Sequence, residues 1–329
     1  MRGEFETIAR LYAPLAAGAP GAFGLRNDAA VVELAPGERS VVTLDAMVEG
    51  VHWLPADPPE AVARKLLRVN LSDLAAMGAV PRSYLLATCL GPSVGDAWLE
   101  GFVAGLAADQ ERYGVTLLGG DTTRTPGPTC LSLTALGAIS EGPCLMRSTL
   151  KAGDGLYVSG TIGDGALGLD VLQDRIEGLA AADRDFLAER YRLPQPRTTL
   201  GPALLGLASA CLDVSDGLVA DASHLTEESG VDLEIEAAAV PLSAAVRAAL
   251  GHRPDLLPRV LTGGDDYELL FGVAAGREGE VAALSARLAL PLTRIGRAVP
   301  ARAAEGGAVR VLDEAGRPLA LETRGWTHF

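Results

Sequence analysis

Aspartates follow several apolar runs in this sequence, and oxygen ligands in such places indicate metal chemistry. The stretch LLGGDTTR (117–124) begins as an apolar run, breaks at two glycines and delivers Asp121 followed by two threonines. Glycines lack a Cβ and let the backbone approach a ligand, while carboxylate and hydroxyl oxygens are the ligands that Mg²⁺ prefers. A plain strand-to-loop turn with solvated polar residues fits this stretch as well, so the other aspartates decide between the two interpretations.

Two more aspartates border predicted strands in the first part of the chain. The run SVVTL (40–44) leads directly into Asp45, and Thr43 lies two residues earlier, so both side chains share one face of the predicted strand. Asp28 stands just before an apolar pair of valines, although Asn-Asp is by itself a favourable turn pair. Both positions repeat the pattern of an apolar strand bordered by a carboxylate.

A predicted helix places another carboxylate on an apolar face. Asp57, Pro58 and Glu60 match the N-cap, N1 and N3 positions of a helix that runs to Met77. Asp73 falls on the apolar stripe of that helix, where an unpaired carboxylate costs several kcal/mol of stability. Either an arginine or a bound cation can serve as its partner. We favour a cation, because other aspartates are expected nearby.

The densest cluster of polar residues lies in LDVSDGL (212–218). Asp213 and Ser215 alternate with a valine and therefore share a face of a predicted strand, while Asp216 and Gly217 open a predicted helix. The first amides of such a helix favour anions, so the cluster combines carboxylates with an anion-binding helix start. Asp216 also suits the ordinary structural role of an N-cap.

Gathered carboxylates repel one another unless divalent cations hold them together. The chain has no GxxxxGK[ST] loop, so we expect a polyphosphate to be held through several Mg²⁺ ions. The stretch GDGALG (163–168) matches GxGxxG, but no second strand follows within the ∼30-residue βαβ unit that a dinucleotide site requires. We therefore expect only a tight strand–helix connection there, which could lie near phosphate. The residues alone predict a Mg-nucleotide enzyme.

The composition excludes several classes of partner. The 329 residues include 28 Lys+Arg and 42 Asp+Glu, with a formal net charge of −14, so we expect no nucleic acid and no anionic membrane as partner. Four scattered cysteines without a CxxC pair argue against a zinc site or disulfides. The N-terminal segment lacks the apolar core of a signal peptide, and no apolar stretch reaches the roughly 20 residues of a membrane span. We expect a cytoplasmic protein.

The periodicity predicts an α/β fold in both halves of the chain. An amphipathic helix is expected over 4–17, a strand over 83–90, a helix over 96–113 and a strand over 129–139. The second half alternates again, with a half-exposed strand predicted over 231–237. The length suits two domains, and a change of character after CLMRST places them at residues 1–148 and 149–329.

Eight motifs, taken in order, cover essentially the whole chain and resemble the thiamine-monophosphate kinase family: RNDAAV, TLDAMVEGVHW, KLLRVNLSDLAAMGAVP, LLGGDTTR, LMRS, LDVSDGL, GGDDYELLF and GWTHF. The resemblance implies the aminoimidazole-ribonucleotide-synthetase-like fold. Its N-terminal α/β domain binds metal and nucleotide and pairs sheets in a homodimer, and a C-terminal α/β domain follows. The implied enzyme uses several Mg²⁺ ions and transfers the γ-phosphoryl group of ATP to thiamine monophosphate, which gives thiamine diphosphate.

The resemblance also implies roles for individual residues. The implied metal ligands are Asp28, Thr43, the backbone of Leu44, Asp45, Asp73, Asp121, Asp213 and Asp216. The implied nucleotide contacts are Gly120, Asp121, Arg147 and Ser215, and the implied substrate contacts are His52, Asp265 and Trp326. His52 also suits a purely structural histidine, and Trp326 also suits a packing anchor. The family usually has Glu where this chain has Asp265, whose side chain is shorter.

The predicted reaction needs no general base. Its nucleophile is a phosphate oxygen of the substrate, largely ionised at neutral pH because the second pKa of a phosphate ester is about 6. The alternative by fold is another ATP-dependent synthetase of the superfamily, acting on a purine-pathway intermediate, but that class lacks GWTHF. An NAD oxidoreductase would rest on GxGxxG alone, and a non-catalytic acidic metal-binding protein would not turn over ATP.

Overall fold

A computed structural model describes residues 4–27, 29–140, 142–302, 307–323 and 325–326, with side chains from residue 6 onward. Asp28 lies outside the described residues, and so do the last three residues of GWTHF. The chain forms two compact units. The N-terminal unit comprises residues 1–74 and 79–142, and the C-terminal unit comprises residues 75–78 and 143–329.

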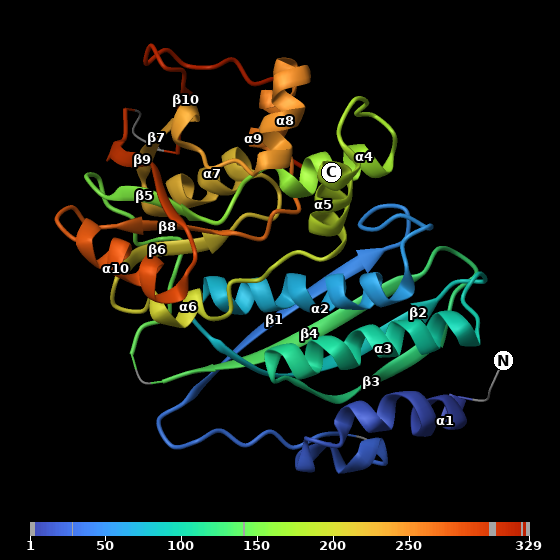
Figure 1. The fold of residues 1–329 in the computed structure, drawn as a ribbon. Coiled ribbons are helices and arrows are strands. Elements are labelled where there is room, and N and C mark those ends of the chain that lie inside the picture. The colour runs from blue at the N-terminus through green and yellow to red at the C-terminus, as the bar shows by residue number, and fades with distance from the viewer. Residues whose placement is uncertain (1–3, 28, 141, 303–306, 324, 327–329) are drawn as a thin grey trace. The chain divides into compact units, whose positions relative to one another are not determined.

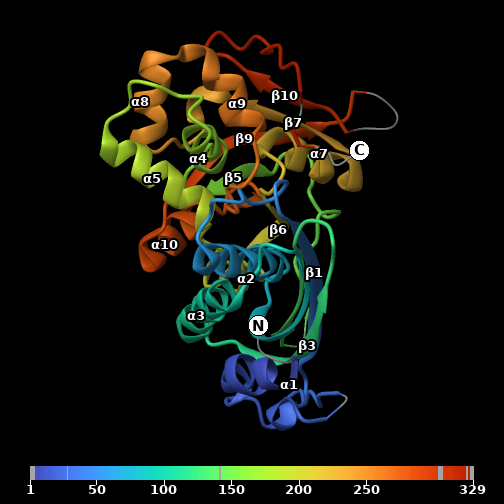
Figure 2. The same ribbon diagram turned by 90° about the vertical axis from the view of Figure 1, so that its right-hand side faces the viewer.

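The N-terminal unit is built on a four-stranded sheet in the order β1-β4-β2-β3. Its strands are β1 (Arg39–Val48), β2 (Val80–Leu90), β3 (Thr116–Arg124) and β4 (Cys130–Ile139). β4 pairs antiparallel with β1 and β2, whereas β2 and β3 are parallel and need a crossover connection, which α3 supplies. Helices α2 (Pro59–Ala76) and α3 (Asp96–Tyr113) cover the same face of the sheet (Figures 1 and 2).

A buried ion pair joins the two covering helices. Nε of Arg68 in α2 lies 2.6 Å from Oδ2 of Asp109 in α3, and both side chains are buried. Arg64 adds a contact of 3.0 Å from its Nε to the other carboxylate oxygen of Asp109. A buried carboxylate without such partners would lower the free energy of unfolding, so the ion pair stabilises the packing of α2 against α3.

The opposite face of the sheet carries exposed apolar side chains. Val42 is 58% exposed and Leu44 is 61% exposed, while the alternate residues of β1 turn toward the helices. Cross-strand pairing continues this face from Leu44 through Thr134 to Leu85. Figure 2 shows α2 and α3 on one side of this sheet only. Among the described residues of the N-terminal unit, no helix covers Val42 and Leu44, whereas the N-terminal helical turns pack against Leu118 and Leu136 farther along the sheet.

Two strands continue past the aspartates at which they were expected to end, so those predictions are wrong. Asp45 pairs with Leu133 inside β1, and Asp121 pairs with Ala87 inside β3. Gly120 is needed for packing against the neighbouring strand, since a Cβ there would overlap the carbonyl oxygen of Leu86. The glycine pair therefore permits a close strand–strand approach and does not break the strand.

The start of α2 also differs from its prediction by one residue. The carbonyl of Pro58 accepts the amide of Val62, so Pro58 occupies the N-cap position and Pro59 is the first helical residue. Asp57 instead accepts the amide of Leu54 at 2.8 Å and stabilises the preceding turn. Of two adjacent prolines, the second takes N1, where a missing N–H costs nothing. The predicted helix over 4–17 is a succession of short helical turns: α1 (Glu4–Thr7), a π-turn (Ile8–Tyr12) and a 3₁₀ turn (Ala13–Ala16).

The C-terminal unit contains a six-stranded sheet in the order β10-β7-β9-β5-β8-β6. Its strands are β5 (Gly155–Ser159), β6 (Ala208–Asp213), β7 (Val231–Glu236), β8 (Leu269–Val273), β9 (Leu292–Pro300) and β10 (Val309–Leu312). All pairs are antiparallel except β10 with β7. The strand predicted over 231–237 is confirmed as β7.

Helices cover both faces of this second sheet. One hydrophobic cluster joins α7 (Leu218–Ser229) and α9 (Leu257–Thr262) to one face, and another joins α6 (Leu200–Ala203) and α10 (Glu278–Leu288) to the other. A third cluster packs α4 (Asp164–Leu172), α5 (Ala181–Arg192) and α8 (Ala244–His252) together (Figure 1). No helix among the described residues has the length and apolar character of a membrane span.

Candidate functional site

Helix α2 is joined to β1 by polar contacts that involve three predicted metal ligands, Thr43, Asp45 and Asp73. Thr43 Oγ1 donates a hydrogen bond of 2.5 Å to Oδ2 of Asp73, and Asn70 Oδ1 accepts the amide of Asp45 at 3.1 Å. Asp73 is half-buried, as its place on the apolar stripe of the helix predicts. The oxygens of Thr43 and Asp73 are hard donors close enough together to become neighbouring ligands of one ion, so this pair suits Mg²⁺.

Asp121 lies on the other side of the same sheet. β1 and β3 are its opposite edges, three strand spacings or about 14 Å apart. Asp121 shares the exposed apolar face with Ala46 and Ala87, whereas Asp45 shares the helix-covered face with Leu133. One Mg²⁺ ion, with ligands at about 2.1 Å, cannot contact both carboxylates in this arrangement. The described residues contain no ready-made group of three or more acidic, histidine or cysteine ligands.

His52 has a structural partner in the turn after β1. Its Nδ1 accepts the amide of Val48 at 3.0 Å, which implies the neutral tautomer with the proton on Nε2. Lys65 of α2 donates to the carbonyl of His52 at 3.1 Å and ties the turn to the helix. These contacts support the structural interpretation of His52 and also hold its ring in one orientation. Leu44 points its side chain to the exposed face, so only its backbone is available as a ligand.

The N-terminal unit contains a cavity of about 190 Å³ between the N-terminal helical turns and strands β2 and β3. Its lining is mixed: apolar side chains alternate with polar groups, which include Asp121, Thr122 and Asn27. The walls include Ile8, Ala22, Leu25, Leu85, Leu117 and Leu118. Tyr12 also lines it, and burial raises the pKa of this phenol to about 12, so the hydroxyl stays protonated at neutral pH. Tyr12 is not among the predicted site residues, because the sequence of its segment shows only the periodicity of an amphipathic helix.

The C-terminal unit brings together predicted residues from three separate stretches. The amide of Asp265 donates to the carbonyl of Ser215 at 2.9 Å, and the amide of Trp326 donates to the carbonyl of Asp216 at 3.0 Å. Glycines permit this contact, because a Cβ on Gly264 would overlap the carbonyl of Ser215. The segments 213–217, 263–268 and 325–326 therefore form one cluster, which we call the loop cluster. The Trp326 side chain is 53% exposed there.

Asp221 organises the loop cluster and was not predicted. Its Oδ2 accepts the amides of Ser215, Asp216 and Gly217 at 3.0, 2.9 and 3.2 Å. Burial raises its pKa well above the ordinary value, and the charges of Asp213 and Asp216 add to this. These three amides lie just before α7, whereas the first amides of the helix itself belong to residues 218–220, so the anion-binding helix start stays a prediction. The N-cap residue is Gly217, so Asp216 does not have the capping role.

The repulsion around Asp221 shows that Asp213 and Asp216 lie near it. Asp213 is buried at the end of β6, where a carboxylate has no structural advantage. Oxygen donors under mutual repulsion suit a divalent cation, which removes that repulsion when bound. Arg147 lies in the connection before β5 with an exposed side chain, and its carbonyl accepts the hydroxyl of Ser229 at 2.7 Å.

The GxGxxG stretch forms a tight strand–helix connection, as expected. The amides of Gly163 and Gly165 donate to the two carboxylate oxygens of Asp266, at 2.7 and 3.0 Å. A Cβ on Gly165 would overlap the carbonyl of Asp265, and a Cβ on Gly168 would overlap that of Leu187. The glycines therefore serve close packing, and a buried aspartate occupies the amides that were considered for phosphate.

The loop 263–268 has an unusual backbone. Asp265 and Tyr267 have φ values of +73° and +52°, in the left-handed region that costs a non-glycine residue about 1–2 kcal/mol. Residues held in such conformations cluster at functional sites, where surrounding contacts enforce them. No local pattern in the sequence predicts this conformation, because neither residue is a glycine.

Comparisons with known proteins agree with this fold and these motifs. The model of the N-terminal domain of AIR synthase related proteins matches residues 26–139, and that of the C-terminal domain matches residues 151–307. The chain is 40% identical to thiamine-monophosphate kinase of Caulobacter vibrioides over 99% of this chain and 90% of that protein. It is 38% identical to the Escherichia coli K12 thiamine-monophosphate kinase over 99% of this chain and 98% of that protein.

Solved structures give the same result. A crystal structure of thiamine-monophosphate kinase from Stenotrophomonas maltophilia has a TM-score of 0.80 and 40% identity, covering 90% of this chain and 91% of that chain. A structure of AaThiL complexed with AMPPCP and TMP has a TM-score of 0.76 and 31% identity, and the match covers 100% of this chain and 99% of that chain. The expected two-domain α/β fold is confirmed, and the chain belongs to the thiamine-monophosphate kinase family of AIR synthase related proteins.

Proposed function

We propose that this protein transfers the γ-phosphoryl group of ATP to thiamine monophosphate and so forms thiamine diphosphate. The observation that carries the proposal is the loop cluster, in which Ser215, Asp216, Asp265 and Trp326 meet from three distant stretches of a family member. The related AaThiL binds AMPPCP and TMP together, which supports a direct transfer between the two ligands.

The chain's own residues would hold and align two phosphates. The nucleophile is already ionised, so catalysis requires alignment and charge neutralisation and no proton removal. Bound Mg²⁺ would supply that neutralisation at the bridging and transferring oxygens. We assign its ligation to the two separated donor groups of the N-terminal unit, to the pair in the loop cluster and to Asp28. The separation within one sheet favours several ions. The residues are Asp28, Thr43, Leu44, Asp45, Asp73, Asp121, Asp213 and Asp216.

We infer that the N-terminal domain (residues 1–148) receives the nucleotide. The 190 Å³ cavity has apolar side chains that could contact a flat base and polar groups that could bind its edge. Gly120 and Asp121 lie among its lining residues, where phosphates and metal would follow. Arg147 and Ser215 would contact the nucleotide as well, by family resemblance. The C-terminal domain (residues 149–329) would contribute most substrate contacts.

We infer that His52, Asp265 and Trp326 contact thiamine monophosphate. The exposed indole of Trp326 is a suitable face for the cationic thiazolium ring, because a cation over an aromatic face is stabilised by about 0.5–2 kcal/mol. Asp265 is one methylene shorter than the usual Glu. Its left-handed backbone conformation holds the carboxylate at a defined place in the loop cluster.

We also propose a homodimer, formed by the exposed apolar face of the N-terminal sheet. Val42, Leu44 and Leu85 give this face the apolar character of a contact surface, and a second copy of the same face is self-complementary. ATP is the donor of the reaction, and we place the protein in the cytoplasm, where ATP is made.

The decisive experiment measures ADP release with ATP and Mg²⁺ and one of three acceptors: thiamine monophosphate, thiamine, or none. We expect ADP only with thiamine monophosphate, because the hydroxyl of thiamine would need a general base. Rapid turnover of thiamine, or no turnover of thiamine monophosphate, would contradict the assignment.

A further inference from the structure

A buried polar network lies directly behind the loop that carries Asp265. Asp266 and Glu268 are 1% and 0% exposed, whereas their neighbours Asp265 and Tyr267 are only half-buried. Even-numbered and odd-numbered side chains of this loop thus point to different environments. The amides of Asp265 and Tyr267 join the segment 213–215, with bonds of 2.9 and 2.8 Å to the carbonyls of Ser215 and Val214.

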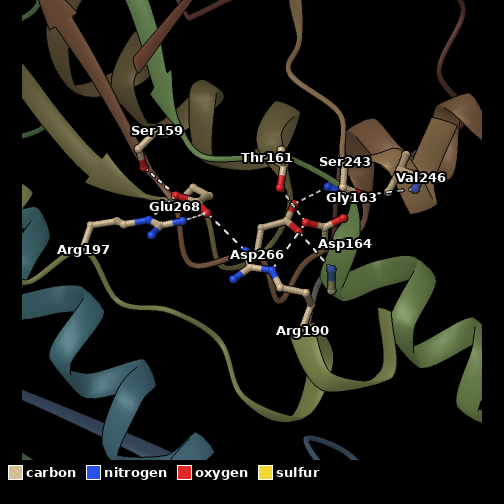
Figure 3. Close-up of polar contacts among 11 residues, drawn as sticks. Ser159, Thr161, Gly163, Asp164, Arg190, Arg197, Ser243, Val246, Asp266 and Glu268 are labelled. Atoms are coloured by element: carbon tan, nitrogen blue, oxygen red, sulfur yellow. Dashed lines mark hydrogen bonds and ion pairs between the residues drawn. The ribbon is translucent and has the colours of Figure 1, made fainter. Parts of the chain in front are cut away.

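Asp266 ties the loop to the start of α4. Its two oxygens each accept one backbone amide, from Gly163 and from Gly165, so each oxygen of the carboxylate is bound to the start of the helix (Figure 3). Burial raises the pKa of Asp266, and so does the nearby charge of Asp164, while the two amides lower it. An asparagine at this place would turn an NH₂ group against one of the amides and lose that bond.

Glu268 ties the other end of the loop to α5 and β5. Its Oε2 accepts the hydroxyl of Ser159 at 2.6 Å and Nε of Arg197 at 2.5 Å, and its Oε1 accepts Nη2 of Arg190 at 3.2 Å. Arg190 also lies 3.4 Å from Asp164, which in turn accepts the hydroxyl of Thr161. Figure 3 shows these side chains in one connected group. A buried network of this kind is rigid only while each carboxylate has its partners.

We propose that Asp266 and Glu268 are positioning residues that hold Asp265 against Ser215 for contact with thiamine monophosphate. The proposal rests on the proposed function, because it assumes that Asp265 contacts the substrate. The two buried carboxylates alternate with the left-handed residues of the loop: Asp266 lies between Asp265 and Tyr267, and Glu268 follows directly after. Their contacts with α4, α5 and β5 maintain a backbone conformation that the loop does not prefer. A small displacement of a positioned group is enough to lower catalytic efficiency strongly.

The test compares Asp266→Asn with a matched control, Asp232→Asn. Asp232 is also 1% exposed and accepts two backbone amides and an arginine, but its partners lie in and beside β10. Both variants should lose thermal stability. Asp266→Asn should raise the KM for thiamine monophosphate about 5- to 50-fold with little change in the KM for ATP, whereas Asp232→Asn should change neither. Assays are run well below both melting temperatures.

A double-mutant cycle with Asp265→Ala separates positioning from general weakening. If Asp266 acts through Asp265, the double variant Asp265→Ala/Asp266→Asn should have the same KM for thiamine monophosphate as Asp265→Ala alone. Additive effects, an unchanged KM in Asp266→Asn, or an equal KM shift in Asp232→Asn would overturn the proposal. If Asp266→Asn does not fold, Arg197→Lys is the second variant. It keeps the charge beside Glu268 but loses the paired contact in which Nε and Nη2 of Arg197 each donate to one oxygen of Glu268. It should raise the same KM about 2- to 5-fold. An unchanged KM in that variant overturns the proposal.

The same assay distinguishes a failure of the proposed function from a failure of the proposed positioning role. Wild-type protein that fails to use thiamine monophosphate contradicts the proposed function. Wild-type protein that uses it, together with an Asp266→Asn variant of normal KM, contradicts only the positioning role.

Discussion

The two units hold their acidic residues in different ways. In the N-terminal unit, Asp45 and Asp121 lie on opposite edges and opposite faces of an open sheet, and neither is fully buried. In the C-terminal unit, the loop cluster is enclosed by the buried carboxylates Asp221, Asp266 and Glu268, which take the chain's own amides and arginines. The first arrangement needs ions and nucleotide to connect its parts, whereas the second is built before any ligand arrives.

The largest expected effect is on the N-terminal donors. Asp73→Asn should lower kcat about 10²- to 10³-fold, because one charge that stabilises the transferring group is lost. Asp45→Asn and Asp121→Asn should act similarly. Stability without metal should stay nearly the same, because these donors lie apart in the sheet and an asparagine at position 73 can still accept the hydroxyl of Thr43. Turnover at saturating Mg²⁺ and thermal melting of the metal-free protein are the two measurements.

A matched control for Asp73→Asn is Asp109→Asn, which breaks the buried pair with Arg68. That change should lower the free energy of unfolding by about 3–5 kcal/mol and leave kcat nearly normal at temperatures where the protein is folded. Near-normal turnover of Asp73→Asn would refute its metal role.

The next effect concerns the exposed apolar face. Val42→Lys places a charge at a position that is 58% exposed now and would be buried in the proposed homodimer. We expect the dimer to dissociate at micromolar concentration, because a buried unpaired charge costs several kcal/mol. Light scattering measures the mass. Val31→Lys, equally exposed but outside the sheet, should leave the mass unchanged. If the wild-type protein is a monomer in this measurement, the homodimer proposal is wrong.

A smaller effect is expected for the exposed indole of the loop cluster. Trp326→Ala should weaken thiamine monophosphate binding about 2- to 30-fold and leave ATP binding unchanged, since a cation–aromatic contact is worth about 0.5–2 kcal/mol. Calorimetric titration with each ligand measures both affinities. Equal losses for both ligands, or a large fall in melting temperature, would show that Trp326 packs the unit.

The smallest expected effect concerns Glu234, an acidic residue of the C-terminal unit that lies outside the loop cluster. The Arg297 side chain lowers the pKa of Glu234 below its usual value, and Arg310 adds to this. A lowered folded-state pKa gives stability that is present above the unfolded pKa of about 4.5 and is lost as pH falls through the folded value. Glu234→Gln should therefore cost about 0.5–1 kcal/mol at pH 7 and less at pH 4. Denaturant titrations at the two pH values measure it; an equal cost at both would contradict the shift.

The sequence by itself determined the element types, the two-domain α/β fold and the motif set. Alternation and capping residues are local signals, and α3 and β7 match their predicted ranges closely for that reason. The motifs LDVSDGL, GGDDYELLF and GWTHF also indicated residues that the fold brings together in the loop cluster.

Only the tertiary structure decided where the carboxylates lie and which of them are internal. β1 and β3 continue past Asp45 and Asp121 because strand pairing, and not local composition, sets the end of a strand. No local pattern singled out Asp221 or Asp266, yet both are buried and accept the chain's own amides. Such partners come from segments up to about a hundred residues away, and no periodicity within one segment reveals them.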